Sequence, residues 1–216
     1  MSAGSLKSGL TAVYIVPYVI AASIGVLFLS WSDMAQILDR GLLSLVSSIP
    51  AVIASLASGT TFLVSLIIQH LLPAPAKEVI VFWRINDRLP GCRAFSHFAE
   101  RDSRIDIDQI RALGGDSSLN PKEQNRLWYK MYKSVANMPS VTQSHRRFLG
   151  FRDLSGVVLL TSPVLLGAHA LMAFDWARFS IIGALLVVSY LATVLAARNA
   201  AGEFVRNVLA LQTRAP

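Results

Sequence analysis

The sequence predicts an all-α integral membrane protein with four transmembrane helices in two pairs and a small, mostly helical cytoplasmic domain between the second and third spans. Of its 216 residues, 53% are hydrophobic and only 15% are charged, whereas soluble domains average about 25% charged residues. In addition, 23 of the 33 charged residues lie in the single segment 74–155. This composition excludes a disordered chain and a plain soluble enzyme, and a lone cysteine, Cys92, excludes a disulfide-stapled secreted module.

The first apolar run covers residues 10–30, where tyrosine is the only ionisable residue type. About 20 apolar residues are enough for a helix to cross the hydrocarbon core of a bilayer. A cleaved signal peptide is the competing interpretation, because Lys7 precedes the run. The run is longer than the core of a signal peptide and contains Pro17, so we expect a retained span.

The second apolar run, residues 41–72, is longer than one perpendicular span needs. Two arrangements fit: an interfacial helix over 41–49 followed by a span over 50–72, or one long helix kinked at Pro50. Pro73 and Pro75 are expected to end this helix. Residues 1–73 therefore form an N-terminal transmembrane pair.

The third and fourth spans are expected at 154–174 and 179–197, and the tight loop between them makes 154–197 an antiparallel hairpin. His169 is the only ionisable residue within the third span. A neutral histidine bonded to a neighbouring helix is the simplest interpretation, and a gate or pH sensor is the alternative. Small residues recur four positions apart in the spans, which favours close packing within one chain or between copies.

The distribution of basic residues sets the orientation. With both termini and the central segment on one side, that side holds 18 Lys and Arg residues and the other side holds 2. Cytoplasmic loops carry the excess of positive charge. We therefore expect a multi-pass protein of the bacterial inner membrane with cytoplasmic N and C termini, and a cytoplasmic amphipathic helix over 198–216.

The cytoplasmic domain, residues 74–153, begins with residues 77–84, either a short strand or an interfacial stretch. An irregular segment with a turn at Pro90-Gly91 follows. A helix over 106–113 is expected next, with Asp102 or Ser103 as its N-cap and Gly114-Gly115 as its stop.

Residues 120–137 then predict a helix, because Asn120-Pro121-Lys122-Glu123 is a strong start signal. Ser140 can cap a last helix that continues into the third span. About 80 residues are few for an independent core. We therefore expect the domain to pack on the extensions of the membrane helices.

No motif in the sequence predicts catalysis, a cofactor or a metal site. The phosphate-binding, dinucleotide-binding and nucleophile-elbow motifs are absent from the sequence. Asp102, Asp106 and Asp108 alternate with arginines, which indicates helix caps and ion pairs rather than a magnesium site. A membrane-bound enzyme would require Arg93, His97 and Asp106 to converge in one pocket.

The basic residues of the cytoplasmic domain are the more informative group. Cations beside aromatic rings can bind phosphates and stack bases, although basic loops also follow from topology and attract anionic lipid. We expect membrane lipids, self-association and a cytosolic protein partner, with nucleotide or nucleic acid less favoured. The candidate partner or phosphate contacts are Arg84, Arg88, Arg93, Arg126, Lys130 and Lys133, and the candidate stacking residues are Trp128 and Tyr132.

The stretches LPGCRAFSHFAERDSRID and PKEQNRLWYKMYKSV also carry a resemblance. Over residues 76–152 the chain resembles small uncharacterised bacterial multi-pass membrane proteins, some of them associated with anti-phage defence. The resemblance implies a bacterial inner-membrane protein that acts in defence or stress sensing, and it implies no mechanism. From the sequence as a whole we expect a non-enzymatic, oligomeric protein whose cytoplasmic domain recruits or senses a partner in an anti-phage defence or envelope-stress system. A pore-forming effector triggered through the cytoplasmic domain, and a membrane-bound enzyme acting on lipid or nucleotide, are the alternatives.

Overall fold

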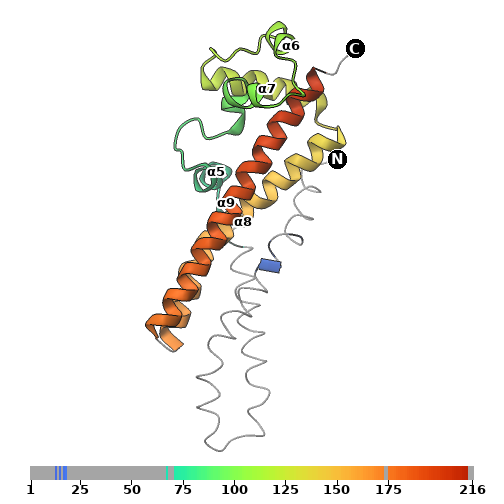
Figure 1. The fold of residues 1–216 in the computed structure, drawn as a ribbon. Helices are drawn as coiled ribbons and strands as arrows, with labels where there is room; N and C mark the ends of the chain where they lie inside the picture. Colours follow the sequence, from blue (N-terminus) through green and yellow to red (C-terminus); the bar gives the residue numbers. More distant parts are fainter. Residues whose placement is uncertain are drawn as a thin grey trace, which may run out of the picture. The chain divides into compact units, whose positions relative to one another are not determined.

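The structure is a computed structural model that describes residues 71–172 and 175–213, together with Val13, Ile15, Pro17, Tyr18 and Ile67. The predicted interfacial helix at 41–49 therefore lies outside the described residues, and so does nearly all of the first two predicted spans. Within the described ranges every regular element is helical (Figure 1). The elements are α5 (Ala74–Phe82), η2 (Pro90–Arg93), η3 (Ala94–Phe98), η4 (Ala99–Arg101), α6 (Ile107–Ala112), α7 (Pro121–Val135), α8 (Pro139–Met172) and α9 (Trp176–Gln212).

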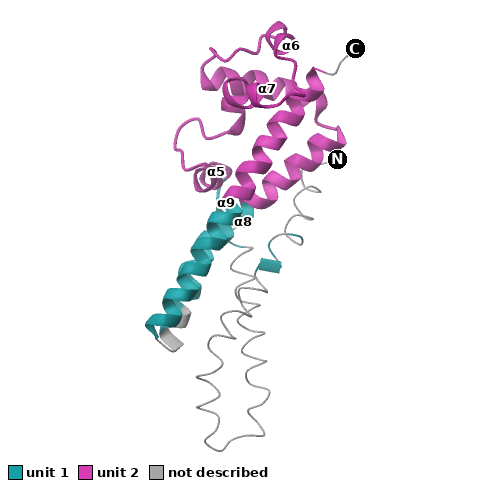
Figure 2. Cartoon of the chain, viewed as in Figure 1, with its two compact units in different colours: residues 1–73, 153–193 teal, residues 74–152, 194–216 magenta. Residues whose placement is uncertain are grey.

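The chain divides into two compact units, each made from separate stretches of sequence (Figure 2). Unit 1 comprises residues 1–73 and 153–193, and unit 2 comprises residues 74–152 and 194–216. Unit 2 therefore combines the charged central segment with the C-terminal part of α9, which the expected boundaries had treated as a separate helix. Each of the helices α8 and α9 is divided between the two units: residues 139–152 of α8 and 194–212 of α9 belong to unit 2, and the rest of each helix belongs to unit 1.

Unit 2 has its own hydrophobic core, to which α5, the short helices, α7, α8 and α9 contribute. The C-terminal part of α9 is the most buried contributor, with Val205, Val208 and Leu209 fully enclosed. The other buried apolar residues include Val81, Ala94, Phe95, Ile110, Trp128, Met131, Val141, Phe148 and Phe204. Phe204, one turn before Val208 on α9, is buried in the same core.

Two of the described helices are long and apolar enough to cross a membrane: the Pro139–Gly167 part of α8, and α9. Large apolar side chains on α9 are left uncovered, with Leu185 57% exposed and Val188 61% exposed. The prediction of one helix that runs from the charged segment into the apolar sequence after residue 154 is confirmed, because α8 continues without a break from Pro139 to Met172. The backbone at His169 belongs to α8, and its side chain is outside the described residues.

The predicted strand over 77–84 is wrong, because these residues belong to the helix α5 and the turn after it. Pro75 lies in the first turn of α5, where a proline is tolerated because its missing N–H would have no helical partner. Its β-branched residues then form a helix because Val81 and Phe82 are buried in the core of unit 2. Tertiary burial here overrides β propensity.

Two predicted caps are also wrong, although their helices are present. Asp106, rather than Asp102 or Ser103, caps α6 by accepting hydrogen bonds from the N–H groups of Asp108 and Gln109. Ser140 lies inside α8, which begins one residue earlier. The predicted glycine stop of α6 is confirmed, since Gly114 has a φ of 85° and the Gly115 N–H donates to the Ile110 carbonyl.

The predicted start of the longer helix is confirmed in detail. Asn120 accepts a hydrogen bond from the Glu123 N–H at 3.0 Å, and Glu123 accepts one from the Asn120 N–H at 3.2 Å. This reciprocal capping box satisfies two donors that the first helical turn leaves free. It sets the start of α7, which supports both the core and the short helices described next.

Candidate functional site

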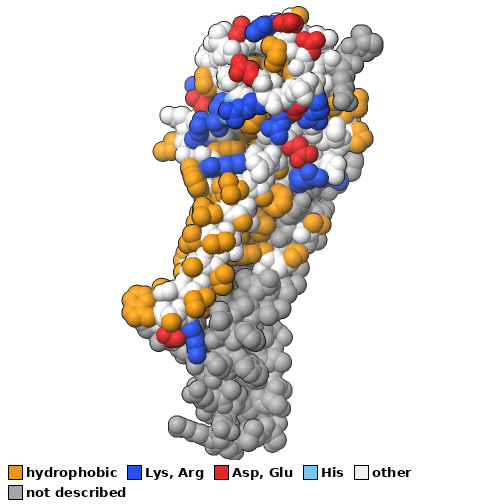
Figure 3. All heavy atoms as spheres, in the orientation of Figure 1, with side chains coloured by type: hydrophobic (Ala, Val, Ile, Leu, Met, Phe, Trp, Pro, Cys, Tyr) orange, Lys and Arg blue, Asp and Glu red, His pale blue; other side chains and the backbone are white. Residues whose placement is uncertain are grey.

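A cavity of about 440 Å³ in unit 2 is lined mainly by basic side chains. Three stretches of chain form it: the end of α5 with the residues after it, the short helices η2 to η4, and the C-terminal part of α9. Figure 3 shows Lys and Arg side chains gathered on one face of unit 2. The lining residues are Phe82, Arg84, Arg93, His97, Phe98, Arg101, Arg198, Asn199, Gly202 and Arg206. We call this the arginine cavity.

The short helices, which carry four of the ten lining residues, are fixed to α7 by one buried amide. The Gln124 side-chain oxygen accepts hydrogen bonds from the N–H groups of Phe95 and Ser96, each at 3.2 Å. Its Nε2 donates to the Leu119 carbonyl at 2.9 Å. Gly91 completes the attachment, because a Cβ there would lie 2.6 Å from Trp128 Cε3. Only glycine lets η2 approach α7 this closely.

Arg198 links α9 to the end of α5 on the other side of the cavity. Its Nε donates to the Val81 carbonyl at 2.7 Å, and its guanidinium lies 4.2 Å from the centre of the Trp83 ring. The Val81 carbonyl is at the C-terminus of α5, where the helix dipole favours a cation. Arg198 is thus held in place rather than mobile on the surface.

Gly202 brings Phe98 against α9. A Cβ at Gly202 would lie 3.0 Å from Phe98 Cε1 and 3.2 Å from an Arg206 nitrogen. The glycine therefore leaves room for an aromatic wall in the cavity. Arg198, Gly202 and Arg206 are four residues apart, so they share one face of α9.

Positive charge in the arginine cavity is only partly balanced. Arg206 lies 3.5 Å from an Asp102 oxygen, but the same carboxylate is 2.6 Å from Arg104. In the part of the chain that the structure describes, Arg84 and Arg93 take part in no hydrogen bond or ion pair, and Arg93 Nε is buried without an acceptor. None of the described residues that line the cavity is Asp or Glu.

The titration behaviour of the lining follows from this crowding. Burial, together with repulsion from Arg101 and Arg93, lowers the pKa of His97 below its ordinary value. Burial and the nearby Arg84 likewise lower the pKa of Arg93. Both shifts have the sign expected where cations are gathered in a partly enclosed space. The lowered pKa favours the neutral form of His97, which can act as a hydrogen-bonding group.

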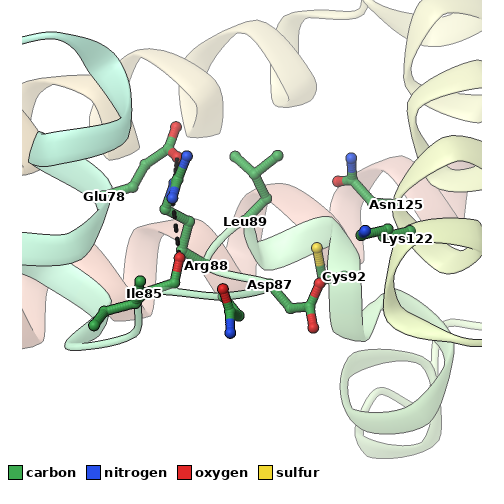
Figure 4. A pocket seen from close by; sticks show the side chains of 9 residues that line it. Glu78, Ile85, Asp87, Arg88, Leu89, Cys92, Lys122 and Asn125 are labelled. Carbon is green, nitrogen blue, oxygen red and sulfur yellow. Dashed lines mark hydrogen bonds and ion pairs between the residues drawn. The ribbon is translucent and has the colours of Figure 1, made fainter.

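The predicted phosphate contacts lie in three separate places in unit 2. Arg84 and Arg93 come together in the arginine cavity. Arg88 does not, because it lines a second cavity of about 600 Å³, shown in Figure 4, where its Nε pairs with Glu78 at 3.1 Å.

Cys92 also lines this second cavity. Burial of the thiol, and to a smaller extent the nearby Asp87 carboxylate, raise the pKa of Cys92. A raised pKa disfavours the reactive thiolate.

The predicted residues on α7 lie elsewhere in unit 2. Arg126 and Lys130 are exposed, and the Lys133 ammonium lies 5.3 Å from the centre of the Tyr129 ring. Trp128 is buried in the core, where it stacks on Tyr132 with 5.8 Å between ring centres.

Sequence reasoning missed several members of the cavity. Arg101, Arg198 and Arg206 were not proposed as contacts, and His97 was proposed only as one of the three residues that a membrane-bound enzyme would need together. The four-residue spacing of Arg198, Gly202 and Arg206 is a signal that the sequence does contain. The approach of α9 to the short helices is not visible in the sequence, because it depends on tertiary packing.

The aspartates near the cavity have structural roles. Asp106 caps α6, and Asp108 pairs with Arg111 at 3.3 Å. Asp102 holds Arg104 and Arg206, as described above. The prediction of caps and ion pairs is therefore confirmed. Of the three residues that a membrane-bound enzyme would need together, Arg93 and His97 line the cavity and Asp106 does not.

Comparisons with protein-family models, with curated proteins and with solved structures find no significant match to this chain.

Proposed function

We propose that this chain is a non-enzymatic, multi-pass protein of the bacterial inner membrane, with four spans and with its termini and unit 2 in the cytoplasm. Unit 2 would sense or recruit a cytosolic protein in an anti-phage defence or envelope-stress system. The protein would work as an oligomer.

The continuity of α8 and α9 supports this proposal most directly. α8 supplies Val141 and Phe148 to the core of unit 2 and continues as an apolar helix to Met172. α9 begins at Trp176 and ends with the buried stripe around Phe204. A ligand or protein that alters unit 2 therefore acts on the same two helices that are long and apolar enough to cross a membrane.

The uncovered face of α9 supports membrane placement and self-association. Ile181, Leu185 and Val188 are all more than half exposed, although they are strongly apolar. In water such side chains favour burial by about 25 cal/mol per Å². Lipid tails or a second copy of the helix would remove them from water.

The topology is testable with two matched single cysteines in a Cys92→Ser background. Ala177→Cys lies on the exposed first turn of α9, and Ser117→Cys lies on the exposed surface of unit 2. A membrane-impermeant maleimide should label Ala177→Cys in intact spheroplasts and should label Ser117→Cys only after permeabilisation. Labelling of both sites in intact spheroplasts would contradict the proposed orientation.

The role in recruitment is testable through the exposed basic face of α7. Arg126→Glu together with Lys130→Glu should abolish co-purification of a cytosolic partner and any protection against phage, whereas the matched control Arg111→Glu on α6 should change neither.

Measurement of the membrane potential distinguishes this function from pore formation. The potential should stay unchanged in cells that express the chain during phage infection or envelope stress. Collapse of the potential would instead favour the pore-forming effector.

A further inference from the structure

The arginine cavity contains more positive charge than the described part of the protein neutralises. Five arginines line it, and Asp102 is shared between Arg206 and Arg104. Holding like charges together in a partly enclosed space has a free-energy cost that grows as solvent is excluded. An anion bound between the arginines would remove that cost.

The donors present suit a phosphate group. Guanidinium groups offer planar pairs of N–H donors that match two phosphate oxygens at once. Arg93 Nε is buried and lacks an acceptor within the described residues, so a bound oxygen would satisfy it. The neutral imidazole of His97 and the Asn199 amide add uncharged donors to the lining.

The size of the cavity indicates more than a bare ion. A volume of about 440 Å³ lies in the usual range for sites that hold small organic molecules. Phe82 and Phe98 form apolar walls beside the arginines. The cavity therefore has room for a phosphate together with part of the group esterified to it.

The position of the cavity along the chain favours a lipid as the source of that phosphate. The apolar sequence 179–197 ends directly before Arg198. Leu195, one helical turn earlier on α9, is 58% exposed, and Trp83 beneath Arg198 is exposed as well. Exposed tryptophan and arginine next to an apolar helix are typical of the headgroup region on the cytoplasmic side of a membrane.

We propose that the arginine cavity is a binding site for the phosphate of an anionic phospholipid headgroup, with Arg84, Arg93, Arg101, Arg198 and Arg206 as its ligands. The phosphate site follows from unit 2 alone. The lipid source rests on the membrane placement proposed above, which the maleimide experiment tests separately.

The test uses the purified full chain in neutral detergent and follows tryptophan fluorescence during titration. The probes are dihexanoyl phosphatidylglycerol, dihexanoyl phosphatidylcholine and inorganic phosphate. Phosphatidylglycerol should saturate at one molecule per chain, counted by native mass spectrometry. Phosphatidylcholine should fail to bind, because its headgroup has no net charge, and added salt should weaken the phosphatidylglycerol complex.

Three variants make the result specific to the cavity. Arg93→Gln should weaken phosphatidylglycerol binding about tenfold, the loss expected for one charge-assisted contact. The matched control Arg111→Gln removes an arginine outside the cavity and should leave binding unchanged. Asp102→Asn should strengthen binding several-fold, because it removes the carboxylate that lies next to Arg206. A gain of affinity cannot be produced by misfolding.

Two outcomes would overturn the proposal in different ways. Equal binding by Arg93→Gln, Arg111→Gln and the unchanged chain would show that the arginine cavity is not the site. Binding of inorganic phosphate that depends on Arg93, with no binding of phosphatidylglycerol, would overturn the lipid source and assign the cavity to a soluble phosphate compound.

Discussion

The imidazole ring of His145 lies parallel to the ring of Phe204, with 4.6 Å between ring centres and 5° between ring planes. Phe204 also makes T-shaped contacts with Trp128 and Tyr132, with 5.2 Å and 5.3 Å between ring centres. These rings come from α7, α8 and α9, so Phe204 is the residue where these three helices meet.

Phe204→Ala should therefore destabilise unit 2 by about 3–5 kcal/mol, because it removes a buried ring and leaves a cavity. Chemical unfolding of the full chain in detergent, followed by tryptophan fluorescence, measures the loss. Met138→Ala removes a side chain that is 48% exposed and serves as the control, with an expected change within about 0.5 kcal/mol. Similar losses for the two variants would argue against Phe204 as the centre of the core.

Gly91→Ala tests the contact between η2 and α7. The added methyl group would overlap the Trp128 ring and the side-chain oxygen of Asn125, which should cost about 1–3 kcal/mol in unfolding free energy. Gly167→Ala is the matched control, since its Cβ would meet no atom within 4 Å and a helical alanine is favoured over glycine. A neutral Gly91→Ala variant would show that η2 can move away from α7.

Asn120→Ala removes one side of the capping box at the start of α7. The expected cost is about 1 kcal/mol, typical for the loss of an N-cap acceptor. Asn137→Ala changes an exposed asparagine beyond the end of the same helix and should have little effect. The midpoints of thermal unfolding of the two variants can be measured by circular dichroism. Equal midpoints would contradict a stabilising role for the capping box.

Asp102 should make stability depend on pH. Hydrogen bonds from Arg104 lower its pKa from 3.8 to about 2. A lowered pKa in the folded state gives a stabilisation that is complete above the unfolded value and is lost as the pH falls from about 5 to 2. Asp102→Asn should therefore cost about 1–2 kcal/mol at pH 7, after allowance for the partly exposed arginines.

The difference in unfolding free energy between the unchanged chain and Asp102→Asn should shrink steadily between pH 4 and pH 2. Asp108→Asn is the control, because the Asp108 side chain is 92% exposed and its pairing with Arg111 should contribute little at any pH. If the difference in unfolding free energy between the unchanged chain and Asp102→Asn stayed constant down to pH 2, the charge of the Asp102 carboxylate would not be the source of the stabilisation.

The parts of unit 2 that the sequence predicted correctly are those controlled by local interactions. The capping box at Asn120 and the glycine stop at Gly114 each involve residues within a few positions of one another. Residues 77–84 were predicted as a short strand or an interfacial stretch, because β-branched and aromatic side chains favour both and give no local signal for a helix. The core of unit 2, which encloses Val81 and Phe82, decides in favour of a helix.

The candidate site divides in the same way. The sequence identified Arg84 and Arg93 as candidate phosphate contacts, because cations near aromatics on a basic domain are visible in composition. It could not separate Arg88, which Glu78 neutralises, from the arginines that remain unbalanced. That distinction depends on which carboxylate is within reach in the folded chain.

The sequence alone determined an apolar chain with one charged segment, two long apolar helices near its C-terminal end, and the local starts and stops of α6 and α7, since these depend on composition and short-range chemistry. The sequence also predicted that the charged segment packs on extensions of the apolar helices, but only the tertiary structure decided which residues of α9 enter the core of unit 2. That packing brings Arg198 and Arg206 to Arg84, Arg93 and Arg101. Residues about a hundred positions apart in the sequence line one cavity. They come together because the apolar residues of α9 are buried in the core, and this packing places the arginines of α9 beside the short helices.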